Sequence, residues 1–155
     1  MAWICVHNPY LKKTDDLDSI DEPGLNQAWD NLCASRQPTA ADLDELAQRF
    51  NMLTGKWMVF AQSDRIDFMW SRIASATHAG TLGISAKASP RADSGSHVIC
   101  IYTGDYTNKD DVDKVRGGLR RLGVKFTIPY KPDIYTHCSV YKGNPWGIPP
   151  SRYHG

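Results

Sequence analysis

An alternation of apolar and polar positions between residues 81 and 103 predicts a β-hairpin, and the rest of the chain is interpreted around it. Apolar residues of its first half recur at every second position: Leu82, Ile84, Ala86 and Ala88. This period of two is typical of a half-buried strand. A second strand is predicted at residues 97–103, and the Pro, Asp, Ser and Gly residues of segment 90–95 supply the turn between them.

The two faces of this hairpin differ in character. If Ser89 pairs with Ser96, one face carries apolar side chains alone: Ala86, Ile84, Ile99 and Ile101. We expect that face to pack on helices. The opposite face holds Lys87 beside Val98, Cys100 and Tyr102, and Arg91 lies at the tip of the hairpin. This second face is the best candidate for a binding surface.

The remaining hydrophobic pattern predicts further strands and four helices. Strands are expected at residues 3–7, 55–61, 124–128 and 130–136. Helices are expected around residues 25–32, at 40–50, from Ser63 or Asp64 to Gly80, and at 108–122. In the last strand, Lys131, Asp133 and Tyr135 would share one face, and Pro132 favours an edge position. This order predicts an α+β fold with a mostly antiparallel sheet covered on one face by helices.

Length and composition add four limits. A chain of 155 residues is expected to form one domain, in which residues 9–54 are a long insertion before a core at 55–145. Its net charge of +1, from 18 Lys and Arg against 17 Asp and Glu, excludes a bulk polycation, so any affinity for nucleic acid must come from a local patch. Four widely spaced cysteines without a CxxC pair favour reduced structural thiols. With no apolar run of about 18 residues, we expect no membrane partner and a cytoplasmic location, also open to the nucleus.

Five blocks of sequence, in one order, resemble the uncharacterised family of the basophilic leukaemia expressed protein. They are GKWMVF, IDFMW, LGISAKAS, HVICIYTGDYTNKDDVDKVRGGLRRLG and YKPDIYT, which lie between about residues 55 and 145. More remotely, VFAQSDRIDFMW and VICIYTGDYTNKDDVDKVRGGLRRLGV resemble the mRNA cap-binding translation initiation factor 4E. The resemblance implies a curved antiparallel sheet with helices on its convex face.

The same resemblance bears on the ligand. In the cap-binding factor, two tryptophans sandwich a methylated guanine, a glutamate reads the edge of the base, and Arg and Lys hold the phosphates. Lys87 falls where a phosphate-binding arginine of that pattern would lie, with Arg91 nearby. Segment 77–81 has no Trp-Glu pair, and the segment before Ser63 has no loop tryptophan in the place where this pattern has one. We therefore do not expect this chain to read the ordinary methylated cap.

The residues themselves also support a site for a nucleotide or single-stranded RNA. Cations on a concave sheet face can hold phosphates, and aromatic rings can stack on bases. The candidate residues are Lys87, Arg91, Lys131, Tyr135, Trp57 and Trp29. A bland alternative stays open for each: Lys87 as a solvated residue of a half-exposed sheet, and Trp57 as core packing within a strand.

Two other classes of function remain as alternatives. A protein partner could bind the helices of the convex face, where Arg116, Arg120 and Arg121 would form a basic surface. A nucleotide hydrolase could be built from His97 or His137 with Asp133 or Asp105. The chain has no zinc-binding histidine pattern and no GxSxG, GxxxxGK[ST] or GxGxxG motif. We therefore expect no catalysis, no metal and no cofactor.

Overall fold

The computed structural model describes residues 3–11, 20–90 and 95–155. Its centre is an antiparallel six-stranded sheet with the strand order β1-β3-β4-β2-β5-β6. The strands are β1 (Ile4–His7), β2 (Gly55–Gln62), β3 (Ser85–Ala88), β4 (Ser96–Thr103), β5 (Pro129–Pro132) and β6 (Tyr153–His154). The long pair β2 and β4 forms the middle of the sheet, and β1 lies at one edge.

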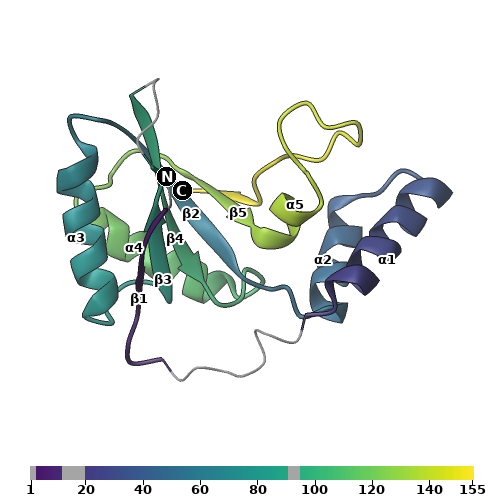
Figure 1. Ribbon diagram of the computed structural model, residues 1–155, viewed down its shortest axis with the longest axis horizontal. Coiled ribbons are helices and arrows are strands. Elements are labelled where there is room, and N and C mark those ends of the chain that lie inside the picture. Colours follow the sequence, from purple (N-terminus) through teal and green to yellow (C-terminus); the bar gives the residue numbers. More distant parts are fainter. Residues whose placement is uncertain (1–2, 12–19, 91–94) are drawn as a thin grey trace.

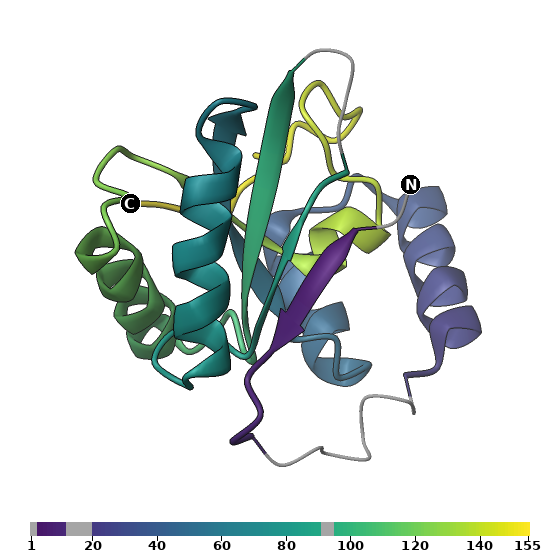
Figure 2. The ribbon, with the colours of Figure 1, turned by 60° about the vertical axis from the view of Figure 1, so that its left-hand side comes forward.

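Helices lie on both sides of this sheet (Figure 1). They are α1 (Glu22–Ser35), α2 (Ala40–Arg49), α3 (Ile66–His78), α4 (Lys109–Arg121) and α5 (Asp133–His137). Helices α3 and α4 cover one face, α3 against β1 and β3 and α4 against β4, as Figure 2 shows from a second direction. Helix α5 lies on the other side, next to β5, and α2 and α1 follow beyond it. The predicted α+β architecture with a curved antiparallel sheet is thus confirmed.

The central hairpin forms with the predicted faces in a different register. Ala88 pairs with Ile99 and Lys87 with Cys100, which shifts the pairing by two residues from a Ser89–Ser96 match. Because side chains alternate with a period of two, a shift of two leaves every residue on its expected face. Ala86, Ile99 and Ile101 are buried toward the helices, whereas Lys87 lies on the other face. Arg91 lies outside the described residues.

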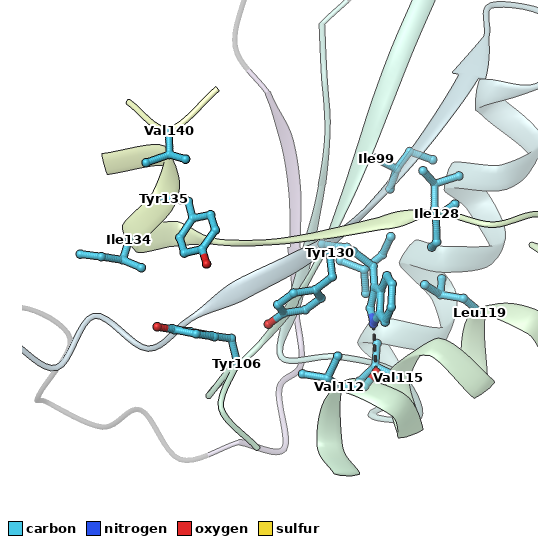
Figure 3. Packing of buried hydrophobic residues seen from close by; sticks show 14 of the residues in the cluster. Ile99, Tyr106, Val112, Val115, Leu119, Ile128, Tyr130, Ile134, Tyr135 and Val140 are labelled. Atoms are coloured by element: carbon cyan, nitrogen blue, oxygen red, sulfur yellow. Dashed lines mark hydrogen bonds between the residues drawn. The ribbon is translucent and has the colours of Figure 1, made fainter. Parts of the chain in front are cut away.

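The core between the sheet and α4 is organised around Trp57 on β2. Its side chain is 1% exposed, and its indole N–H donates to the carbonyl of Val112 at 2.9 Å, which supplies the partner that a buried indole needs. Tyr130 lies edge-on to it, with ring centroids 5.2 Å apart. Figure 3 shows Val112, Leu119 and Tyr130 converging in this layer. Helix α4 thus confirms the helix expected at residues 108–122, and its buried side chains face this core.

The segment before β2 supplies two helices that pack against α5 and the C-terminal residues. Helix α2 begins with a capping box, in which Thr39 and Asp42 bond each other's backbone amides. Helix α1 is longer than the short helix expected there, at 14 residues. Trp29 of α1 meets Trp146 edge-on at 5.0 Å, so segment 20–50 is fastened to the far end of the chain.

Three element predictions were wrong. Residues 124–128 form no strand, because the carbonyls of Val124 and Phe126 accept hydrogen bonds from Arg116 instead of a neighbouring strand. The strand expected at 130–136 ends at Pro132, and α5 begins at Asp133, whose backbone amide is held by the carbonyl of Thr54. Neither Ser63 nor Asp64 caps α3, which begins after Arg65 without a side-chain cap.

Candidate functional site

The sheet face that α3 and α4 leave uncovered carries three lysines. We call it the open face, and its central side chains are Lys56, Lys87, Cys100, Tyr102 and Lys131. They share one face because strand pairing places Lys131 beside Lys56, Lys56 beside Tyr102, and Lys87 beside Cys100. The lysines therefore come from three different strands, β2, β3 and β5, which span the middle of the sheet.

Lys56 is the most tightly held of the three. Its Nζ donates to Asp133 Oδ1 at 2.6 Å and to Thr136 Oγ1 at 2.9 Å, and both partners belong to α5. Thr54 donates its hydroxyl to the other oxygen of Asp133 at 2.6 Å. A buried ammonium needs such a partner, so this ion pair fixes α5 beside β5 and leaves little of the Lys56 charge for a ligand.

Lys87 faces aromatic rings instead of a carboxylate. Its Nζ lies 4.5 Å from the ring centroid of Trp3 and 5.6 Å from that of Tyr102. Within the part of the chain that the structure describes, no carboxylate bonds to this ammonium. Ring faces attract a cation without neutralising it. The charge of Lys87 is therefore free to meet an anion.

Lys131 has the same kind of environment at the other end of the face. Its residue is 5% exposed, and its Nζ lies 3.8 Å from the ring centroid of Tyr141. Burial, and then the positive charge of Lys56, lower the pKa of Lys131 to about 8. No described carboxylate forms an ion pair with it. A bound anion would favour its charged form and supply the missing partner.

Two of the rings around these lysines reach solvent. Trp3 is 40% exposed and Tyr141 is 54% exposed, whereas Tyr102 between them is half-buried. Tyr102 was expected on this face from the hairpin pattern, whereas Trp3 and Tyr141 were not predicted to lie there. The pairing of β1 with β3, which places Cys5 opposite Lys87, brings Trp3 over that lysine. An apolar run at residues 3–7 predicts a strand, yet nothing local indicates which strand it joins.

The predicted aromatic residues do not lie on the open face, which corrects that part of the site. Trp57 points into the helix-covered core because it alternates with Lys56 along β2. Trp29 is buried against Trp146. Tyr135 is buried on α5, since the chain turns into a helix where a strand was expected. Of the predicted cations, Lys87 and Lys131 are both on the open face.

The basic helical surface expected on α4 is also corrected. Arg116 is buried and donates to three backbone carbonyls, those of Gly155, Val124 and Phe126, at 3.0, 2.8 and 2.7 Å. It therefore acts as a structural clamp between α4 and the C-terminal segment. Arg120 and Arg121 stay exposed on the last turn of α4, where the helix dipole favours cations.

The helical side of the molecule carries a groove of about 530 Å³ between α3, the end of β2 and residues 122–126. Three phenylalanines on its wall are half exposed or more: Phe60, Phe68 and Phe126. Arg65 and Arg72 line it together with one carboxylate, Asp64. Large exposed aromatic side chains grouped in this way are typical of an interaction surface.

The histidine–aspartate pairs that the expected hydrolase would need do not form. His97 meets Ser63 Oγ at 3.1 Å, and His137 meets Asn26 at 2.6 Å, whereas Asp133 binds Lys56 and Asp105 binds Thr107. Among the described residues, no group of three His, Cys, Asp or Glu side chains could hold a metal ion. Nor does any helix in those ranges have the length and apolar character to cross a membrane.

Comparisons with known proteins agree with this architecture. Residues 25–139 match the family model described as the basophilic leukemia-expressed protein Bles03. Among solved structures, a crystal structure of schistosome eIF4E complexed with m7GpppA and 4E-BP has a similar fold, with a TM-score of 0.51. That match covers 99% of this chain and 95% of the other at 14% sequence identity. At this identity the likeness establishes the fold alone.

Proposed function

We propose that this chain, which belongs to the basophilic leukemia-expressed protein Bles03 family, binds a nucleotide or single-stranded RNA on its open face. One observation carries the proposal: Lys87 and Lys131 lie on that face without a described carboxylate partner, each beside an aromatic ring. Phosphate groups are the ligands that suit such cations, and rings that reach solvent suit the faces of bases.

The fold supports the same assignment. The schistosome eIF4E structure that this fold resembles was solved with m7GpppA, a nucleotide ligand. The aromatic residues of the present open face are Trp3, Tyr102 and Tyr141. Trp3 directly precedes β1, Tyr102 is on β4, and Tyr141 lies in the loop after α5. Stacking of one base on such a ring contributes about 1 to 3 kcal/mol. Two free lysines and a few rings therefore support modest affinity that falls measurably as salt is raised.

A thermal-shift and titration series tests this function. We expect at least one ligand from a panel of guanosine, adenosine and uridine phosphates, with and without base methylation, plus an eight-nucleotide RNA, to raise the melting temperature. The stabilisation should weaken as salt is raised, because phosphate binding releases counterions. Lys87→Gln should reduce it, whereas Lys114→Gln, which removes an exposed lysine of α4, should not.

Two outcomes would contradict the proposal. One is that no ligand of the panel stabilises the protein at either salt concentration. The other is that Lys87→Gln and Lys114→Gln bind with the affinity of the wild type, which would move the ligand away from the open face.

One observation favours a second candidate function, the binding of a protein partner on the helical side. The groove beside α3 exposes three phenylalanines and has two arginines against one aspartate on its wall. Its apolar surface and net positive charge fit a partner peptide that carries an apolar anchor flanked by acidic residues. The schistosome eIF4E structure also contains a protein, 4E-BP, in addition to its nucleotide. The two candidate functions occupy opposite sides of the sheet and do not exclude each other.

A further inference from the structure

The open face repeats one arrangement, a lysine beside an aromatic ring, at two places. At one place Lys87 lies 4.5 Å from the ring of Trp3, and at the other Lys131 lies 3.8 Å from the ring of Tyr141. Between them lie Tyr102 and Lys56, whose ring centroid and Nζ are 6.0 Å apart. The two cation-ring pairs therefore stand on either side of a central ring.

The distance between these two pairs follows from the strand order. Lys87 is on β3 and Lys131 on β5, with β4 and β2 between them. The two lysines are also offset along the strands. On β2, Lys131 pairs with Lys56, whereas Lys87 lies level with Met58, because Lys87 pairs with Cys100 and Cys100 pairs with Met58. The offset between Lys56 and Met58 is two residues. With a strand spacing of about 4.8 Å, their Cα atoms are about 16 Å apart. A single phosphate group at one pair leaves the other pair unoccupied.

We infer that the open face binds a stretch of single-stranded nucleic acid that runs across the strands from β3 to β5, with consecutive nucleotides spread over the two cation-ring pairs. The inference rests on the proposed function and specifies its ligand class. A nucleic acid strand repeats a phosphate and a base, and the face repeats a cation and a ring. Stacking rings need unstacked bases, so a single strand fits this surface and the paired bases of a duplex do not.

The distribution of charge along this path, and the exposure of its two outer rings, agree with the assignment. Lys56, in the middle, is neutralised by Asp133, so the free positive charges are confined to the two ends. Trp3 and Tyr141, which accompany those two lysines, are also the most exposed rings around the face. An acidic peptide would satisfy the lysines and leave the rings without a partner.

Competition measured by fluorescence anisotropy tests the ligand class on the whole chain. The probe is a labelled eight-nucleotide oligouridine, and the competitors are unlabelled oligouridine, oligothymidine of the same length, UMP, UTP and hexaglutamate. We expect the octanucleotides to compete at concentrations about tenfold or more below those of UMP and UTP, because a mononucleotide occupies one pair.

Variants of each pair locate the strand. Lys87→Gln and Lys131→Gln should each weaken octanucleotide binding and reduce the slope of log affinity against log salt by about 0.7, the value for one phosphate contact of a single strand. Trp3→Ala and Tyr141→Ala should weaken binding with the salt slope unchanged. Lys131→Arg keeps the charge and should retain the slope, and the melting temperature of each free variant shows that it is folded.

The results distinguish a failure of the strand inference from a failure of the proposed function. If UTP or hexaglutamate competes as well as the octanucleotide, or if only one lysine affects its affinity, the strand inference is wrong while the open face remains a site for anions. If the octanucleotide does not bind, or binds both lysine variants with the affinity of the wild type, the proposed function itself is wrong.

Discussion

Lys131 is the residue whose chemistry departs furthest from that of an ordinary surface lysine. Burial and the neighbouring charge of Lys56 lower its pKa to about 8, so its charge changes between pH 7 and 9. In the unfolded chain a lysine titrates near 10.5, so between about pH 8 and 10.5 the unfolded chain binds more protons than the folded one. Stability should consequently rise with pH between about 8 and 10.5, because neutralisation removes the cost of burying the charge.

Ligand binding should show the opposite pH dependence. A phosphodiester requires the charged form of Lys131, so the affinity for the octanucleotide should fall as pH rises through about 8, by about tenfold between pH 7 and 9. Lys131→Arg should remove this fall, since arginine stays charged. Anisotropy titrations at closely spaced pH values check it. An equal fall in wild type and Lys131→Arg would show that another group titrates.

Helix α4 shows how one residue can fix an element against a segment without regular structure. Arg116 lies four residues after Val112 and three before Leu119, which places it on the buried stripe of the helix. Its guanidinium satisfies three carbonyls of residues 124, 126 and 155. Its charge suggested a basic surface shared with Arg120 and Arg121, although its helical position already indicated the core.

Substitution of Arg116 should be costly for this reason. Arg116→Ala leaves buried carbonyls without a donor and is expected to lower the free energy of unfolding by about 3 to 5 kcal/mol. Arg120→Ala, its matched control on the exposed end of the same helix, should change that free energy by less than about 0.5 kcal/mol. Urea denaturation of both variants gives the two values. Similar losses for the two would contradict the clamp.

At the scale of the whole molecule, the sequence predicted the face of each hairpin residue. It did not predict the elements and side-chain positions that depend on contacts between residues far apart in the chain. Alternation with a period of two places Lys87 on the open face in either register, which is why a two-residue error in pairing did no harm. Helix α5 was missed because Lys131, Asp133 and Tyr135 alternate like strand residues, whereas a tertiary ion pair between Asp133 and Lys56 sets their conformation.

The rings of the candidate site had no local signal. Trp3 reaches Lys87 through the pairing of β1 with β3, and Tyr141 reaches Lys131 through the turn after α5. In contrast, the core needs Trp57 and Trp29, the two tryptophans that were candidates for base stacking. The role of residues 20–50 was equally open in the sequence, and the structure places α1 and α2 beside α5.

Backbone amide NMR during titration with the eight-nucleotide RNA tests the central claim most directly, because it compares the two sides of the sheet in one experiment. We predict saturable shift changes for Lys87, Tyr102 and Lys131 and their neighbours on β3, β4 and β5, and none for the groove beside α3. Shift changes confined to Phe68, Arg72 and Phe126, or none anywhere at saturating RNA, would contradict the open face as the binding site.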